Sequence, residues 1–262
     1  MMSVTATNFD DGIAYEAWMG RWSRIVGEKF LEWLAPAEKL SWLDVGCGNG
    51  AFTELVYAKC APSGIQGVDP SQEQLDVANS RPSSKTIEYR IGAAQALPFD
   101  DNTFDIVGMA LAINLPPDPK KAVAEMVRVT KPGGSVATYM WDIPNGGITM
   151  EPIRAALRGM NINTPIFGET ITTPENMKEL WENAGLNDVS LTRIEIDLSF
   201  KSFDDFWSSN TGVENTAVRA MKSLSDTEIE TLKANLKSSL PRDSDGNIRY
   251  VAFANAVKGL AT

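Results

Sequence analysis

The chain has 262 residues, 43% of them hydrophobic, and its 24 basic and 34 acidic residues give a formal net charge of −10. This length fits one elaborated domain or two small ones. The acidic balance, with Lys120-Lys121 as the longest basic run, disfavours nucleic acid and anionic membranes as partners. Histidine is absent, which excludes Ser-His-Asp triads and His-ligated metal sites.

Cysteine content and hydropathy indicate the compartment. The two cysteines, Cys47 and Cys60, are too few for a disulfide framework or a thiolate zinc site, so we expect no metal and a reducing environment. No apolar run approaches the roughly 20 residues of a membrane span, and residues 1–11 lack the features of a signal peptide. We therefore expect a cytoplasmic protein, and the sequence leaves its oligomeric state open.

From Leu40 onward, short apolar runs alternate with amphipathic helical patterns, which is typical of parallel strands joined by crossover helices. The expected strands are Ser41–Val45, Gly64–Val68, Thr86–Ile91, Phe104–Ala110, Ser135–Trp141, Val189–Phe200 and Ile248–Val257. The expected helices of this core are Phe52–Lys59, Ser71–Asn79, Asp118–Val129 and Thr173–Gly185. The pattern predicts an α/β fold with a doubly wound, Rossmann-like, seven-stranded sheet whose last strand runs antiparallel at the sheet's end.

Two helical regions flank this core. Residues 1–40 place Trp22, Phe30 and other apolar side chains at helical spacing, and residues 202–241 form a helical insert between the last two strands. Residues 41–201 are the expected ligand-binding core, which residues 242–262 complete with the final strand. Packing against the core is the simpler interpretation of both apolar stripes.

A glycine-rich turn follows the first expected strand, within Leu43–Gly50. Glycines at such a turn let a ligand approach the backbone, and Gly46-Cys47-Gly48-Asn49-Gly50-Ala51 also satisfies a loose dinucleotide-binding pattern. Asp44 precedes these glycines, and a buried carboxylate would repel a pyrophosphate but pair with a cationic ligand. We therefore disfavour NAD. A carboxylate bonded to neighbouring loop amides is the alternative role for Asp44.

Asp69 ends the second expected strand, where an acidic side chain of a doubly wound sheet accepts hydrogen bonds from ribose hydroxyls. An aspartate that only forms the turn before Pro70 is the alternative. An adenosine ligand of either kind, NAD or another, would use this carboxylate.

At these positions the chain resembles the class I S-adenosylmethionine-dependent methyltransferases, particularly the small bacterial enzymes of the methyltransferase type 11-like branch that act on small molecules. The resemblance is carried, in order, by Leu43–Gly50, Gly67–Ser71, Gly92–Phe99 with Phe104-Asp105 after it, and Arg128–Gly134. It extends over nearly the whole chain, and it implies S-adenosyl-L-methionine as cofactor.

The resemblance also implies roles for individual residues. The methionine end of the cofactor would be held by Asp44, Gly46 and Gly48, the ribose by Asp69, and the adenine by Pro70, Ala93, Ala94 and Gln95. Many relatives have Asp where this chain has Ala93, so Gln95 is the candidate replacement for a bond to the adenine amino group. Residues 1–40 would form a lid whose Tyr15 and Arg24 close over the cofactor, Arg24 by pairing with its carboxylate.

The acceptor side is inferred from topology. Ala110 and Leu115 follow the fourth strand at the edge where ligands of such sheets bind, and should line the methyl-transfer channel. Above Met140 and Trp141, we expect a roof of three aromatic side chains from the insert, Phe203, Phe206 and Trp207. An apolar or aromatic small molecule is favoured, although Arg154 and Arg158 leave a carboxylate acceptor open.

Methyl transfer from a sulfonium is an in-line displacement for which the protein mainly supplies alignment and exclusion of water. If the acceptor is a phenol or an enol, Asp142 and Tyr139 at the end of the fifth strand are the candidate bases, though a structural role is the more frequent one for such residues. Two other functions stay open. One is a protein that binds the cofactor without turnover, and the less favoured one is an NAD-dependent oxidoreductase.

Overall fold

The computed structural model describes residues 12–262, with side chains described from Gly20 onward, and its centre is a seven-stranded sheet. The strands are β1 (Ser41–Val45), β2 (Gly64–Asp69), β3 (Glu88–Ile91), β4 (Phe104–Ala110), β5 (Thr130–Trp141), β6 (Asn187–Phe200) and β7 (Ile248–Leu260). Their order is β3-β2-β1-β4-β5-β7-β6. Strands β1 to β5 run parallel to one another, and β7 runs antiparallel to both of its neighbours, β5 and β6. This confirms the doubly wound, Rossmann-like sheet with an antiparallel last strand.

The last strand of the chain is not the last strand of the sheet. We expected β7 at the sheet's end, but it lies between β5 and β6. The amino-acid composition of β7 explains this interior position. Its side chains Ala252, Ala254 and Ala256 are fully buried, as an interior strand requires. In β6, by contrast, Arg193 and Glu195 are exposed, and charged side chains are common on edge strands.

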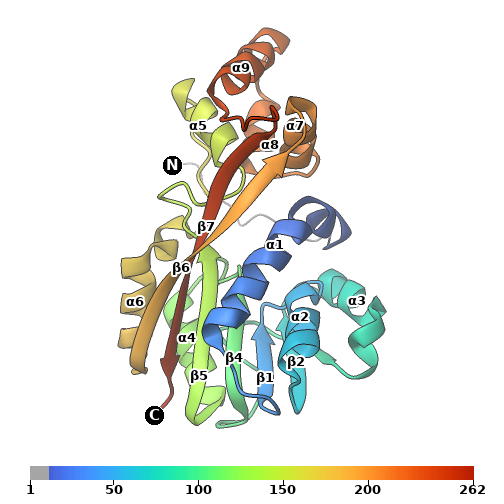
Figure 1. Cartoon of the computed structure of the whole chain (residues 1–262). Helices are drawn as coiled ribbons and strands as arrows, with labels where there is room; N and C mark the ends of the chain where they lie inside the picture. Colours follow the sequence, from blue (N-terminus) through green and yellow to red (C-terminus); the bar gives the residue numbers. More distant parts are fainter. Residues whose placement is uncertain (1–11) are drawn as a thin grey trace.

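Helices cover both faces of the sheet (Figure 1). One layer holds α1 (Gly12–Leu34), α2 (Ala51–Cys60) and α3 (Gln72–Ser80), and the other holds α4 (Pro119–Val129) and α6 (Pro174–Asn183). The remaining helices are α5 (Glu151–Gly159), α7 (Phe203–Thr211), α8 (Thr216–Met221) and α9 (Asp226–Ser239), with 3-10 turns at Pro82–Lys85 and Glu169–Thr172. No helix of residues 12–262 has both the length and the apolar character needed to cross a membrane.

Side-chain caps set where these helices begin. Ser71, Asp118 and Thr173 each accept a hydrogen bond from the backbone N–H three residues later, and Ser225 and Glu228 form both bonds of a capping box. Each such cap contributes about 1 kcal/mol to helix stability. The helix starts at Ser71, Asp118 and Thr173 are therefore confirmed to within one residue.

The second half of α1 is part of the hydrophobic core. Val26 and Phe30 are buried, and the Phe30 ring lies 4.6 Å from the ring of Tyr139 on β5. The second half of α1 is therefore fixed against the sheet by this packing.

A helical cap sits beyond the main sheet, where β6 and β7 extend past the other strands (Figure 1). It contains α7, α8 and α9 from the expected insert, and also α5, for which we predicted no helix. α5 contacts α8 and α9, so residues on both sides of β6 in the chain build the cap. The apolar face of α5 includes Ile153 and Leu157, which are fully buried. The helices α8 and α9 that contact α5 are distant from it in the chain.

Candidate active site

A cavity of about 1190 Å³ opens at the carboxyl ends of β1, β2, β4 and β5. The strand order reverses between the neighbours β1 and β4, and ligands of doubly wound sheets bind at this reversal. The lining comes largely from segments that follow these strands, namely residues 46–49, 69–74, 93–95, 109–112, 114–117 and 139–141. Residues far apart in the chain thus share one space, as the parallel topology predicts.

The loop after β1 is bonded within the protein. Gly46, Gly48 and Gly50 have φ values of 68°, 51° and 80°, a left-handed conformation that favours glycine. The Gly46 N–H donates to the Val68 carbonyl at 2.8 Å, the Gly48 N–H to Asp69 Oδ2 at 2.8 Å and the Gly50 N–H to the Cys47 carbonyl at 2.9 Å. A pyrophosphate loop directs such N–H groups at its ligand, so their use here argues against a dinucleotide.

Asp69 braces this loop and reaches the cavity. Its side chain is 8% exposed, Oδ2 accepts from the Gly48 N–H at 2.8 Å, and Oδ1 accepts from the Ser71 N–H at 2.9 Å. Burial raises the pKa of this carboxyl, and the two backbone bonds act in the opposite direction. Each oxygen keeps lone-pair capacity toward the cavity, which fits a ligand that donates two hydroxyls.

The residues expected around the adenine lie on the same side of the cavity. Pro70, Ala93, Ala94 and Gln95 all line it, and the Ala96 N–H closes a tight turn on the Ala93 carbonyl at 3.0 Å. The Ala93 methyl group can form no hydrogen bond, so it cannot supply the side-chain bond to the adenine amino group for which Gln95 is the candidate replacement.

Asp44 does not line the cavity. It is 1% exposed, and Oδ2 accepts from Thr53 Oγ1 at 2.7 Å while Oδ1 has no hydrogen-bond partner. Burial, with a smaller contribution from the charge of Asp69, raises its pKa to about 7. The unpartnered Oδ1 lies behind the glycine loop and does not reach the cavity. A cationic group of a ligand on the other side of the loop would stabilise its charge without touching it.

α1 contributes Gly20, Ser23 and Arg24 to the cavity. The Arg24 guanidinium is bonded to Glu28 at 3.4 Å, and its side chain is 72% exposed, so it stands at the mouth. Tyr15, the second expected lid residue, lies outside the residues whose side chains are described. Its role stays a prediction.

The acceptor side is apolar. Ala110, Leu115, Met140 and Trp141 line it as expected. The wall is completed by five side chains that sequence analysis missed, namely Ile143, Ile148, Met150, Ile166 and Phe167. The signal for them was weak: apolar residues scattered among glycines and prolines after the fifth strand have no periodicity.

The two candidate bases occupy structural positions. Tyr139 lines the cavity but is 1% exposed, with its ring 4.6 Å from Phe30 and 5.6 Å from Phe52. Asp142 does not line the cavity and instead accepts from Asn145 Nδ2 at 3.0 Å within a turn. Its carboxylate is bonded within this turn, and a role of Asp142 as a base stays a prediction. Residues 12–262 also hold no cluster of three Asp, Glu or Cys side chains suited to a metal ion.

The aromatic residues of α7 do not roof the cavity, which corrects a second expectation. Phe206 is fully buried with its ring 5.4 Å from Phe200, and Phe203 stacks on Trp207 at 6.0 Å. They form the core of the cap because α7 packs against β6, away from the cavity. The insert reaches the cavity through the start of α8 instead, where Asn215 and Thr216 line it.

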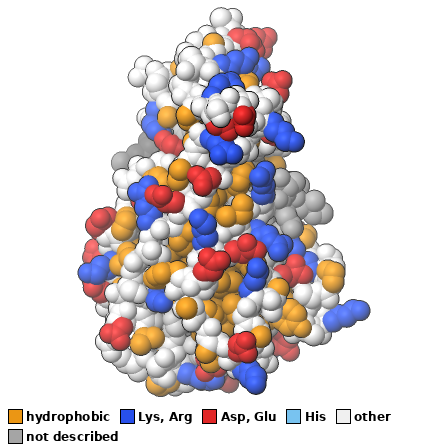
Figure 2. Space-filling view, in the orientation of Figure 1, with side chains coloured by type: hydrophobic (Ala, Val, Ile, Leu, Met, Phe, Trp, Pro, Cys, Tyr) orange, Lys and Arg blue, Asp and Glu red, His pale blue; other side chains and the backbone are white. Residues whose placement is uncertain are grey.

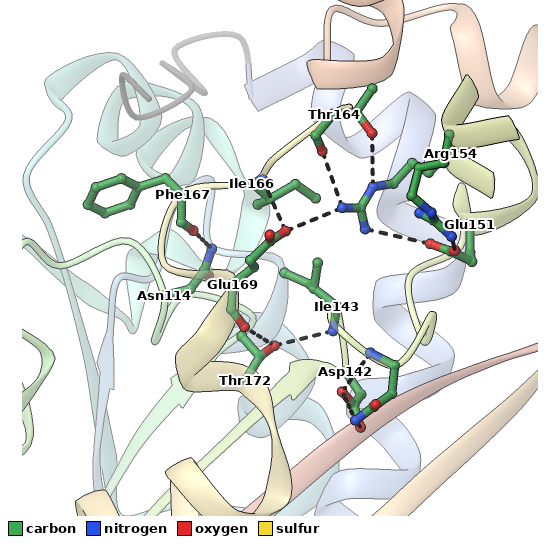
Figure 3. Close-up of polar contacts among 12 residues, drawn as sticks. Asn114, Asp142, Ile143, Glu151, Arg154, Thr164, Ile166, Phe167, Glu169 and Thr172 are labelled. Carbon is green, nitrogen blue, oxygen red and sulfur yellow. Dashed lines mark hydrogen bonds and ion pairs between the residues drawn. The ribbon is translucent and has the colours of Figure 1, made fainter. Parts of the chain in front are cut away.

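A buried ion-pair network around Arg154 connects α5 to residues 164–169, which include the cavity residues Ile166 and Phe167 (Figure 3). Arg154 is 6% exposed, donates to the Thr164 carbonyl at 3.2 Å and pairs with Glu169 at 3.3 Å and Glu151 at 3.6 Å. Glu169 in turn accepts from the Ile166 N–H at 3.1 Å. Arg158 pairs with Glu151 outside the cavity. Both arginines that left a carboxylate acceptor open are thus occupied by glutamates.

The doubly wound sheet, the glycine loop and the acidic residue that ends β2 form a Rossmann-like fold with a cavity at the strand reversal. The structure superposes with a TM-score of 0.57 on Haemonchus contortus phosphoethanolamine N-methyltransferase 2 in complex with S-adenosyl-L-methionine, at 20% identity over 95% of this chain and 56% of that one. At this identity the likeness shows the fold alone.

Sequence comparison finds a methyltransferase domain. Residues 43–138 match the model of this domain. It is 42% identical over 111 residues to an uncharacterized methyltransferase of Schizosaccharomyces pombe, covering 38% of this chain and 40% of that protein. It is 28% identical over 172 residues to a demethylmenaquinone methyltransferase of Lactobacillus johnsonii, covering 59% and 70%. The first match spans less than half of its relative.

Proposed function

We propose that this protein is an S-adenosylmethionine-dependent methyltransferase whose acceptor is a small apolar or aromatic molecule. The observation that carries the proposal is the two-part cavity, in which the loop braced by Asp69 and an apolar chamber share one space. The methyltransferase domain over residues 43–138 supports the reaction type. NAD-dependent oxidation fits poorly, since the loop N–H groups that a pyrophosphate needs are already bonded.

The residues present fit the cofactor. When bound, S-adenosylmethionine supplies a methyl group that its sulfonium activates for in-line displacement by the acceptor. Asp69 would accept the ribose hydroxyls, with Pro70 and Ala93–Gln95 beside the adenine and the Gly46–Gly48 backbone at the methionine end. The unpartnered oxygen of Asp44 would stabilise the amino group from behind the loop.

The chain contributes alignment and exclusion of water. The apolar wall from Leu115, Trp141 and Phe167 disfavours water around the acceptor, which strengthens the electrostatic attraction between a nucleophile and a cationic methyl donor. We assign no base among the described residues of the acceptor chamber, since Tyr139 is packed among aromatic rings and Asp142 lies in a turn. A proton released by the acceptor would therefore pass to water.

Charge supports a neutral acceptor. Among the described lining residues the cations are Arg24 and Arg81, which pair with Glu28 at 3.4 Å and Glu54 at 2.7 Å. On the face shown in Figure 2, Lys and Arg side chains are interspersed with Asp and Glu rather than gathered by sign. Similarity to a demethylmenaquinone methyltransferase also supports an apolar ring as the acceptor.

Calorimetry with three ligands tests this proposal. We expect S-adenosylmethionine and S-adenosylhomocysteine to bind saturably and NAD to show no heat of binding. Incubation with S-adenosylmethionine and a panel of aromatic alcohols, amines and quinols should then yield a product heavier by one CH2 group. Binding without any product would favour the non-catalytic alternative, and NAD binding alone would refute the proposal.

A further inference from the structure

Asn114 is a cavity residue whose side-chain acceptor is buried and unsatisfied. The residue follows β4, lines the cavity and is 2% exposed. Its Oδ1 is buried with no hydrogen-bond partner. A buried amide oxygen without a partner destabilises the folded state, so the position points to a donor that arrives with a ligand.

The orientation of the Asn114 amide follows from its neighbour. Nδ2 donates to the Phe167 carbonyl at 2.9 Å (Figure 3). A carbonyl oxygen can only accept, so the nitrogen must face Phe167 and the oxygen must be the free end. Rotation of the amide would set two oxygens against each other, and Oδ1 is therefore held as an acceptor.

The segment that carries Phe167 is fixed in turn. Gly168 has φ +65°, and a Cβ there would lie 2.2 Å from the Asn114 carbonyl oxygen, so the two backbones approach as closely as glycine allows. Glu169 accepts from the Ile166 N–H at 3.1 Å and pairs with the buried Arg154 at 3.3 Å. The Arg154 network thus positions the segment whose Phe167 carbonyl binds the Asn114 amide.

We propose that Asn114 Oδ1 binds an O–H or N–H group of the methyl acceptor, so that the enzyme selects ring compounds bearing a hydroxyl or amino group. This inference rests on the proposed function and specifies its substrate class. The amide oxygen is too weak a base to remove the proton at neutral pH; it orients the donor and holds the attached oxygen or nitrogen in the chamber. Apolar side chains that line the same cavity, including Leu115 and Ile166, offer no competing acceptor.

Ser23 on α1 provides a matched control. Its Oγ is also buried without a partner and the residue also lines the cavity, but a hydroxyl can donate as well as accept. The inference assigns selectivity for donors to Asn114, because that amide presents only its oxygen. Ser23→Ala should therefore leave this selectivity unchanged.

Two pairs of probes measure the selectivity on protein saturated with S-adenosylhomocysteine: 1-naphthol against 1-methoxynaphthalene, and aniline against N,N-dimethylaniline. Each pair shares a ring and differs in the N–H or O–H group. We expect the donor-bearing member to bind about tenfold more tightly, from one hydrogen bond to a buried acceptor. In Asn114→Leu the ratio should fall to about one, because the variant keeps the side-chain volume and removes the acceptor.

The ratio separates recognition from packing, since a displaced wall alters the affinity of both members of a pair. S-adenosylhomocysteine affinity and melting temperature, measured on each variant, show whether the fold and the cofactor side remain. Loss of the ratio in Asn114→Leu and its retention in Ser23→Ala supports the inference. An unchanged ratio in Asn114→Leu, loss in Ser23→Ala, or no preference in the unmodified protein overturns it. Failure of S-adenosylhomocysteine to bind the unmodified protein would instead refute the proposed function.

Discussion

The two halves of the cavity are built in different ways. On the cofactor side, Gly48, Asp69 and Ser71 come from two short segments after neighbouring strands and bond to one another through the backbone. On the acceptor side, Asn114, Phe167 and the cap residue Asn215 come from distant parts of the chain and meet through tertiary packing. The first half depends on local motifs and the second on long-range contacts, so mutations should affect the two halves separately.

The largest expected effect is that of Gly168→Ala on the acceptor half. A Cβ at this positive φ would lie 2.2 Å from the Asn114 carbonyl oxygen, so backbone must move. We expect a loss of about 2 to 4 kcal/mol in the free energy of unfolding, measured with urea. Affinity for S-adenosylhomocysteine should change less than about threefold, within the range of an indirect effect.

Gly246→Ala is the control for backbone strain alone. Gly246 has φ +81°, but nothing lies within 4 Å of a Cβ built there. The Gly246→Ala substitution should lower the free energy of unfolding by about 1 kcal/mol. Equal losses for the two glycines would contradict the close approach of Gly168 to Asn114.

Asp69→Asn should weaken the cofactor half. An amide cannot accept from both the Gly48 and Ser71 N–H groups, and it loses the charge that favours ligand hydroxyls. We expect S-adenosylhomocysteine to bind about 10- to 150-fold more weakly by calorimetry, equivalent to about 1.5 to 3 kcal/mol.

Asp142→Asn is the matched substitution on another strand end. The Asp142 carboxylate is bonded to Asn145 within its turn, so its replacement should change the affinity less than about twofold. Equal losses of S-adenosylhomocysteine affinity in the two variants would contradict a specific role for Asp69 in binding the cofactor.

Asp44 makes the stability of the cofactor half depend on pH. Burial raises its pKa to about 7 from a usual 3.8, so the folded protein binds a proton more tightly than the unfolded chain. Stability therefore falls as the pH rises between these values and levels off above pH 7, where both states are ionised. Between pH 5.5 and pH 8 this amounts to about 2 kcal/mol.

Asp44→Asn removes this titration. The variant keeps an oxygen that can accept from Thr53 Oγ1, at present 2.7 Å from the carboxylate. Urea unfolding at several pH values should show a flatter profile for the variant than for the unmodified protein. Parallel profiles would place the titrating group elsewhere.

The smallest effect should come from Trp207→Ala in the cap. Trp207 is half-buried, stacks on Phe203 at 6.0 Å and has the Lys233 ammonium 5.4 Å from its ring. Its truncation should lower stability by about 1 to 2 kcal/mol through lost apolar contact. Cofactor affinity and the ratio of rates among acceptors should not change, and a selective change in acceptor choice would return α7 to the substrate site.

Sequence alone predicted the strands, most helix starts and the cavity residues of the glycine loop and Asp69. Strand periodicity, the glycine turn and capping residues such as Ser71 and Asp118 act over a few neighbours in the chain, and the topology of parallel strands brings their carboxyl ends together. Asp69 could therefore be placed at the cavity from its position in the chain alone.

Tertiary structure decided the acceptor half. The apolar patterns of Phe206 and Ile153 indicate burial but not the partner, and the packing of α7 on β6 and of α5 on α9 put both into the cap core. β7 entered between β5 and β6 because its alanines suit an interior strand. The bond from Asn114 to Phe167 joins residues 53 apart in the chain. Local propensity cannot encode such a contact, because it depends on how whole elements pack.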